Sequence, residues 1–164
     1  MVTETLDCYS CKSNSGEQRI SPGPTIYEGK YWYVEHAYPV GMVGWLVLVL
    51  KRHVEALHEL SAHEFAELGV LQGTVARLLH LELSSQKEYI MCFAEAEHFN
   101  HVHVHIVAIA HDLPHELRGP RILAMLKSEQ VEPLPPDEIA AFCSHLKSRI
   151  TIDPAHGPKG DRPK

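Results

Sequence analysis

The sequence predicts an α+β domain built on a largely antiparallel sheet, with one long helix and a C-terminal helix. Short runs of Val, Ile, Trp and Tyr lie between Gly- and Pro-containing turns, which is typical of strands. Two segments, 61–83 and 137–149, carry apolar residues at helical spacing instead. The strands predicted at 89–93 and 101–109 are joined by a short connection, so they are most simply antiparallel neighbours. A length of 164 residues suits one domain, which we place at 1–150.

The N-terminal part of the chain is predicted to form a hairpin and a buried strand. Residues 1–25 mix Cys, Ser, Gly and Pro and predict irregular structure. Aromatic and β-branched residues over 25–36 predict a strand or hairpin with its turn at 28–30. After a loop at 39–44, the apolar run 45–50 predicts a buried strand.

The long helix is predicted to begin at Ser61. Ser61 and Glu64 match a capping box, in which each side chain satisfies a free backbone donor of the other residue. The apolar positions that follow keep helical spacing to about residue 83 and predict one core-facing side. These positions are Phe65, Leu68, Leu71, Val75, Leu78 and Leu79.

The C-terminal part is predicted to contain a short helix around 122–127 and a Pro-rich linker at 132–136. The amphipathic helix at 137–149 follows, with Ile139, Phe142, Cys143 and Leu146 on one stripe. Residues 151–164 combine Pro, Gly and charged residues and predict a disordered tail.

Composition and charge argue against a nucleic-acid or membrane partner. Acidic residues number 21 against 15 basic ones, so a basic stripe that follows a phosphate backbone is not expected, although a compact phosphate-bearing ligand fits. The N-terminus lacks the apolar core of a signal peptide, and the longest apolar run, 41–50, is about half the length that crosses a bilayer. Four cysteines, two of them in a CxxC pair, indicate a reduced protein and a cytoplasmic location.

The most informative segment is 101–107, which reads HVHVHIV. Side chains in a strand alternate between its two faces, so the three imidazoles lie on one face with about 6.5–7 Å between successive Cα atoms. The Val and Ile residues between them face the core. An imidazole can act as a nucleophile, acid, base or metal ligand near neutral pH, so the pattern predicts a functional site.

Three interpretations of these histidines compete. A solvent-facing strand that is merely rich in histidine conflicts with the alternating apolar residues. A catalytic metal site is the second interpretation, because His-x-His on a strand suits zinc, but the carboxylates of binuclear metallohydrolases are missing here. The third is covalent catalysis, in which one imidazole attacks phosphorus while its neighbours hold the phosphoryl oxygen and assist the leaving group.

The HVHVHIV segment resembles the His-φ-His-φ-His-φ-φ signature of the histidine triad (HIT) nucleotide hydrolases and transferases. Residues 44–53 resemble the family strand of pattern G-H-x-L-V-I-P-K-x-H, and the similarity covers roughly 8–110. The stretches 93–97 and 120–123 most resemble a bacterial branch described as diadenosine-tetraphosphate-hydrolase-like. The resemblance implies a HIT-like fold and a homodimer.

The resemblance also implies a separate role for each histidine. His103 would be the nucleophile that attacks the α-phosphorus and forms a nucleotidyl-histidine intermediate. His105 would hydrogen-bond the phosphate and assist the leaving group, and His101 would position the site or bind zinc. The implied activity is hydrolysis of a dinucleoside polyphosphate or nucleoside phosphoramidate to a nucleoside monophosphate. The alternative is a nucleotide-binding or sensing protein with little turnover.

The chain departs from the family pattern at several positions beside the triad. Trp45 replaces a family histidine, and Leu50 replaces a proline. The family's Gly-Gln phosphate loop is replaced by 97–100, where we hypothesise that His98 or Asn100 supplies a substrate contact; the alternative is that these residues only form a loop.

A zinc site is the last expectation. The pair Cys8 and Cys11 is by itself a weak zinc signal. In zinc-bearing HIT proteins such a pair joins two histidines, which correspond here to His53 and His101. The resemblance therefore implies a structural Cys2His2 zinc site that staples the N-terminal segment to the sheet; a metal-free, reduced CxxC pair is the alternative.

Overall fold

The computed structural model describes residues 7–126 and 131–152, and it confirms the predicted α+β class. Five strands form one antiparallel sheet in the order β1-β2-β3-β5-β4, so β3 and β5 lie side by side at its centre. The predicted hairpin and buried strand are both present. The strands are β1 (Tyr27–Glu28), β2 (Trp32–His36), β3 (Trp45–Leu50), β4 (Lys87–Met91) and β5 (His103–Ile109).

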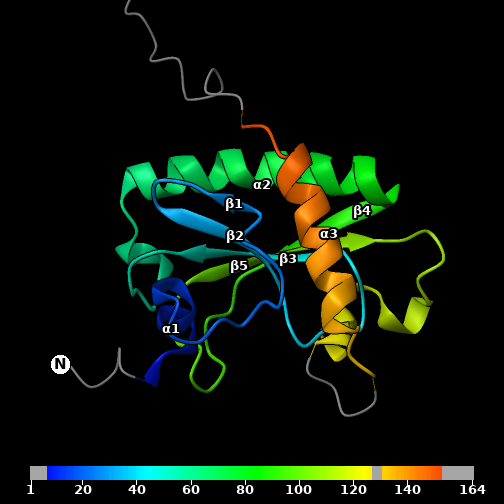
Figure 1. The fold of residues 1–164 in the computed structure, drawn as a ribbon, viewed down its shortest axis with the longest axis horizontal. Coiled ribbons are helices and arrows are strands. Elements are labelled where there is room, and N and C mark those ends of the chain that lie inside the picture. The colour runs from blue at the N-terminus through cyan, green and yellow to red at the C-terminus, as the bar shows by residue number, and fades with distance from the viewer. Residues whose placement is uncertain (1–6, 127–130, 153–164) are drawn as a thin grey trace, which may run out of the picture.

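Helices lie on both sides of this sheet (Figure 1). The long helix α2 (Ala62–Leu83) runs along one side, and the short helix α1 (Tyr9–Ser15) lies on the other. The predicted C-terminal helix is α3 (Pro136–Arg149), which crosses in front of the sheet in this view. The connections contain the 3-10 helices η2 (Leu57–Glu59), η3 (His115–Leu117) and η4 (Gly119–Met125).

One face of the sheet packs against α2. Trp32 donates its indole N–H to the backbone carbonyl of Glu64 in α2 at 2.9 Å. Trp32 pairs with Leu50, and Leu48 pairs with Val104. Because paired residues point to the same side of a sheet and alternate residues of a strand share a face, these apolar side chains all face α2.

The opposite face carries two of the three histidines. His103 pairs with Val49, and His105 pairs with Val47, so both point away from α2. The predicted shared face is confirmed for this pair. His101 precedes β5, which begins two residues later than predicted. The cause is Val102, whose N–H bonds to the carbonyl of Val54 in the loop after β3, at 2.6 Å.

Helix α2 begins with the predicted capping box. The Ser61 hydroxyl accepts the N–H of Glu64 at 3.3 Å, and the Glu64 carboxylate accepts the N–H of Ser61 at 2.7 Å. Arg52 donates to the same buried carboxylate and, with Ser61, lowers the pKa of Glu64 to about 2. The prediction that Phe65 faces the core is wrong: its side chain is 45% exposed. Glu64 takes the inward position instead, one and two turns before the buried Leu68 and Leu71.

The N-terminal segment differs from its prediction, since part of the supposedly irregular 1–25 is helix α1. Cys8 caps this helix, because its Sγ accepts the N–H of Cys11 at 3.4 Å. Gly16 ends it with a φ of 79°, in the left-handed region that glycine adopts most easily. The helix residues are mostly polar, so apolar periodicity gave no signal for it.

Two further boundaries shift. Strand β4 starts and ends two residues before the predicted 89–93, because its ladder with β5 stops where Met91 pairs with His105. The helix predicted around 122–127 is the 3-10 helix η4, and residue 127 lies outside the described residues. The tail predicted at 151–164 lies outside them from residue 153 onward.

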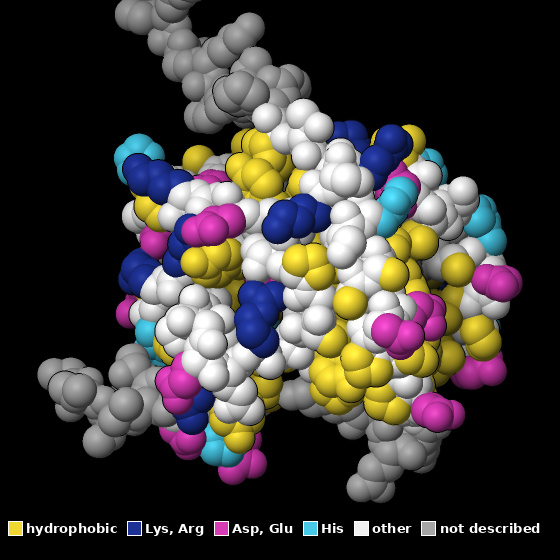
Figure 2. All heavy atoms as spheres, viewed as in Figure 1, with side chains coloured by type: hydrophobic (Ala, Val, Ile, Leu, Met, Phe, Trp, Pro, Cys, Tyr) yellow, Lys and Arg dark blue, Asp and Glu magenta, His cyan; other side chains and the backbone are white. Residues whose placement is uncertain are grey.

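On the face shown in Figure 2, acidic and basic side chains are interspersed, and hydrophobic side chains gather around the lower end of α3. Within the described residues, no helix combines the length and the apolar character needed to cross a membrane.

Candidate active site and cysteine–histidine cluster

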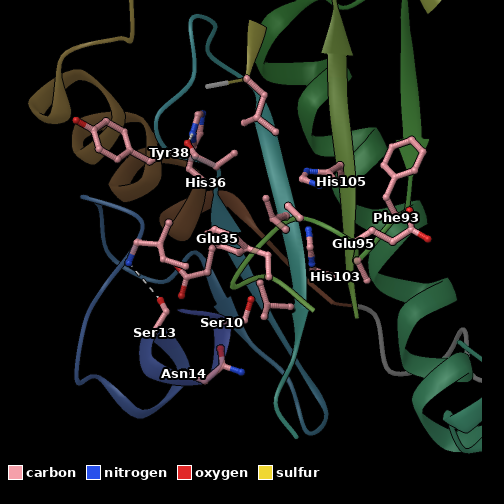
Figure 3. A pocket seen from close by; sticks show the side chains of 18 of the residues that line it. Ser10, Ser13, Asn14, Glu35, His36, Tyr38, Phe93, Glu95, His103 and His105 are labelled. Atoms are coloured by element: carbon pink, nitrogen blue, oxygen red, sulfur yellow. Dashed lines mark hydrogen bonds between the residues drawn. The ribbon is translucent and has the colours of Figure 1, made fainter. Parts of the chain in front are cut away.

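A cavity of about 210 Å³ lies on the sheet face that carries His103 and His105. Val47 and Val49 of β3 line it beside these histidines. Its other walls come from α1, the end of β2, the connection between β4 and β5, and η4 (Figure 3). The cavity is therefore assembled from segments that lie far apart in the sequence.

His103 is held in one tautomer by the backbone. Its Nδ1 lies 2.6 Å from the carbonyl oxygen of His101. A carbonyl oxygen can only accept, so Nδ1 carries the proton, and the electron pair of the neutral ring is on Nε2. An imidazole with its electron pair on Nε2 has the form that a nucleophile requires.

His105 is held in the opposite tautomer to His103, with its proton on Nε2. The indole Nε1 of Trp45 lies 2.9 Å from Nδ1 of His105. Because an indole N–H can only donate, Nδ1 of His105 accepts, and the neutral ring carries its proton on Nε2. The rings of His103 and His105 are 4.9 Å apart between centroids. One ring thus has an electron pair on Nε2, and its neighbour has an N–H there.

The ring of His101 belongs to a second cluster rather than to the cavity. Its Nδ1 lies 3.5 Å from the Sγ of Cys8 and of Cys11. The Sγ of Cys11 is also 3.3 Å from Nδ1 of His53. The four side chains each offer one ligand atom, and these atoms all lie within 4.8 Å of one another.

The outer nitrogens of the two clustered histidines face acceptors. Nε2 of His101 lies 2.7 Å from the carbonyl oxygen of Leu50, and Nε2 of His53 lies 3.4 Å from a carboxylate oxygen of Glu55. This arrangement directs the Nδ1 electron pairs toward the sulfurs, as metal-binding histidines require. Burial lowers the pKa of His101 to about 4 and so keeps its ring neutral. Burial and the neighbouring Cys8 raise the pKa of Cys11 to about 12, which a bound cation would reverse.

No protein-family model matches the sequence, and the comparison with curated proteins finds no match. The structure is similar to solved histidine triad proteins. One from Bradyrhizobium japonicum has a TM-score of 0.64 at 21% identity, covering 78% of this chain and 90% of that one. A hypothetical histidine triad nucleotide-binding protein from Sulfolobus tokodaii has a TM-score of 0.65 at 19% identity, covering 87% and 91%. The chain has the histidine triad fold.

A third neighbour with this fold is a zinc-bound histidine triad family protein from Mycobacterium smegmatis. Its TM-score is 0.63 at 16% identity, covering 88% of this chain and 96% of that one. In the present chain, two thiols and two neutral imidazoles form a donor set of the kind that zinc prefers. The four residues expected to bind zinc are thus brought together, and they could hold a metal ion.

The two expected substrate contacts lie elsewhere in this histidine triad fold. The ring of His98 stacks on Tyr9 with centroids 4.8 Å apart, and its Nδ1 lies 2.9 Å from the carboxylate of Asp7. Neither His98 nor Asn100 lines the cavity; Phe99, between them, does. The φ of His98 is 63°, a left-handed conformation that turns the chain there. The substrate contact hypothesised for His98 or Asn100 stays a prediction, and it would require substrate to extend beyond this cavity.

Sequence reasoning missed the polar wall that α1 contributes. Ser10, Ser13 and Asn14 line the cavity (Figure 3). Asn14 also donates to the carbonyl of Leu50 at 2.9 Å, which fastens the helix to the end of β3. The signal that could have revealed this wall was the expected pairing of the CxxC motif with His53 and His101, because that pairing brings α1 beside the central strands.

Proposed function

We propose that this protein is a nucleotide hydrolase that cleaves at the α-phosphorus of a dinucleoside polyphosphate or nucleoside phosphoramidate and releases a nucleoside monophosphate. The observation that carries the proposal is the hydrogen bond from His103 to the carbonyl of His101, because it leaves the Nε2 electron pair on a residue that lines a cavity. The likeness to histidine triad proteins, one of them described as nucleotide-binding, supports a nucleotide substrate.

The reaction has two steps. In the first, Nε2 of His103 forms a bond to the α-phosphorus, and the bond from phosphorus to the leaving group breaks with its electron pair on the leaving group. The Nε2–H of His105 donates a hydrogen bond to a phosphoryl oxygen as charge develops there. In the second step, the oxygen of water forms a bond to the same phosphorus, and the water loses a proton to solvent. The bond between phosphorus and Nε2 of His103 breaks, and its electron pair stays on Nε2.

The cysteine–histidine cluster is proposed to hold a structural zinc ion. Two thiolates and two imidazoles complete a tetrahedral set, so no position is left for substrate. The ion would fasten α1, a wall of the cavity, to His101, whose carbonyl accepts the proton of His103. No chemical step passes through the metal.

A second copy of the chain is the proposed partner. Leu57, Phe65 and Ile90 are 42%, 45% and 50% exposed, and they surround one hollow between η2, α2 and β4. Among the described residues, strand β4 lies at the edge of the sheet and pairs only with β5. Clustered exposed hydrophobic side chains beside an edge strand are typical of a protein contact, which supports the homodimer that the resemblance implies.

One observation favours the alternative, a nucleotide-binding or sensing protein with little turnover. Trp45 stands where the family pattern has a histidine, so one imidazole is missing from the site. For either function we propose a cytoplasmic location, which the absence of disulfides among the four cysteines supports.

The test is to trap the intermediate. The protein is mixed with diadenosine tetraphosphate, and the reaction is quenched in alkaline denaturant. The protein is then digested, and mass spectrometry tests for an adenylyl group on His103. His103→Ala should lose both the adduct and turnover, whereas His111→Ala, at an exposed position, should keep both. An adduct on another residue, or full turnover by His103→Ala, would contradict the mechanism. Tight binding with neither adduct nor turnover in the wild type would favour the sensing function.

A further inference from the structure

Trp45 and His105 are diagonal neighbours on the two central strands. Trp45 pairs with Val107, and His105 pairs with Val47, so the two side chains lie on the same face, offset by two residues. An aromatic side chain spans that separation. Trp45 is fully buried and His105 is 8% exposed, and the distance from Nε1 to Nδ1 is 2.9 Å. The two side chains therefore form a hydrogen bond that is largely shielded from water.

This bond limits what His105 can do with protons. The indole N–H has no electron pair to offer, so Nδ1 of His105 must remain an acceptor. A second proton on Nδ1 would bring two N–H donors face to face at 2.9 Å in a buried place. If His105 gave its Nε2 proton away, a costly imidazolate would remain. His105 can donate a hydrogen bond, but it cannot deliver a proton and take one up again.

From this geometry we propose that Trp45 makes the site selective for phosphoanhydrides over phosphoramidates, by holding His105 as a neutral hydrogen-bond donor. The inference rests on the proposed hydrolase function and narrows its substrate class. When the P–O bond of an anhydride breaks, the electron pair leaves on a phosphate oxygen, which is stable as an anion. When a P–N bond breaks, the nitrogen must gain a proton as it departs, because an amide anion is too basic to leave.

Two other ionisable side chains of the cavity already make hydrogen bonds within the protein. The carboxylate of Glu35 accepts from Thr25 at 2.7 Å and from Arg19 at 3.1 Å. His36 faces the carbonyl of Ala37 with Nδ1 and the N–H of Gly44 with Nε2. A leaving amine would therefore take its proton from another source than these two side chains.

The first experiment compares two substrates with one nucleoside. Wild-type protein is assayed with diadenosine tetraphosphate and with adenosine 5′-phosphoramidate. We expect kcat/KM to favour the anhydride by about 100-fold, the factor that a positioned general acid commonly contributes. Equal or faster cleavage of the phosphoramidate would overturn the proposal. If neither substrate is cleaved, the hydrolase function itself fails, and the next measurement still decides the state of His105.

The second measurement observes the tautomer directly. Long-range ¹H–¹⁵N NMR spectra of wild-type protein, with the signals of His105 assigned by their loss in His105→Gln, should show the proton on Nε2. A proton on Nδ1 would contradict the role assigned to Trp45, whatever the activity.

Two variants complete the test. Trp45→Phe removes the N–H but keeps an aromatic ring, and Trp45→His supplies a group that can pass on a proton. Each should shift the ratio of phosphoramidate to anhydride cleavage upward by about tenfold or more. Trp32→Phe is the matched control, because Trp32 is also fully buried and donates its N–H to a backbone carbonyl on the other face. It should leave the ratio unchanged. A ratio that stays constant in folded Trp45 variants, or that moves equally in the control, would overturn the proposal.

Discussion

The carbonyl oxygen of His101 accepts the Nδ1 proton of His103 at 2.6 Å, while the ring of the same His101 contacts two cysteine sulfurs. One residue thus joins the cysteine–histidine cluster to the proposed nucleophile. Whatever fixes the ring of His101 also fixes the carbonyl that orients His103. The cluster is therefore expected to affect catalysis through geometry as well as stability.

Removing a sulfur from the cluster should release the metal. We expect the wild type to contain about one zinc ion per chain and Cys8→Ser to contain much less. Turnover should fall by about tenfold, because α1 and the His101 carbonyl lose their anchor, and the melting temperature should fall as well. Metal analysis, an assay and a thermal melt measure these effects. Cys92→Ser, at a half-buried cysteine outside the cluster, is the control. A wild-type protein purified without metal would contradict the zinc assignment.

Glu64 should make stability depend on pH in the acid range. Its pKa is lowered from 4.5 to about 2 by Arg52 and Ser61, so the ionised form is stabilised in the folded state. That contribution is complete above pH 4.5 and is lost as pH falls toward 2. Glu64→Gln should lower the free energy of unfolding by about 1–3 kcal/mol near neutral pH and by little near pH 2. Urea unfolding at several pH values measures this, with the exposed Glu116→Gln as control. A pH-independent difference would exclude the ion pair as its source.

Gly44 should tolerate no side chain. Its φ is +82°, and an added Cβ would overlap the end of the Leu83 side chain and lie 3.1 Å from the Cβ of Ala108. Gly44→Ala should therefore cost about 2 kcal/mol or more in unfolding free energy, from backbone strain together with overpacking. Gly16→Ala separates the two causes, since Gly16 has a φ of +79° with open space around it. It should cost about 1 kcal/mol from strain alone. Equal losses in the two variants would show that packing at Gly44 contributes nothing.

A charge in the hydrophobic hollow beside β4 should separate the proposed dimer. Ile90→Lys places an ammonium where a second copy would bury an apolar side chain, so light scattering should show a monomer. Leu81→Lys is the control, because Leu81 is 73% exposed but does not line that hollow. A wild-type protein that is monomeric at micromolar concentration, or an Ile90→Lys variant that remains dimeric, would contradict this interface.

Much of the fold could be predicted because its signals are local. Alternation with period two placed the side chains of His103 and His105 on one face, and the capping box marked the start of α2. The apolar spacing of the helix wrongly placed Phe65 in the core. Glu64 points inward instead, because its carboxylate pairs with Arg52 from a distant segment. Helix α1 escaped prediction because its residues are polar and its stability depends on docking.

The sequence by itself determined which residues share a strand face, since the periodicity of side chains follows from backbone geometry alone. Through the resemblance, the sequence also predicted which four cysteine and histidine side chains form a cluster, and the structure places their ligand atoms within 4.8 Å of one another. Only the tertiary structure decided what distinguishes the three histidines. The tautomer of His103 follows from its bond to a backbone carbonyl, and that of His105 from its bond to the indole N–H of Trp45. The contact between Trp45 and His105 depends on the register between β3 and β5. Register joins residues far apart in the chain, so no local pattern could have revealed it.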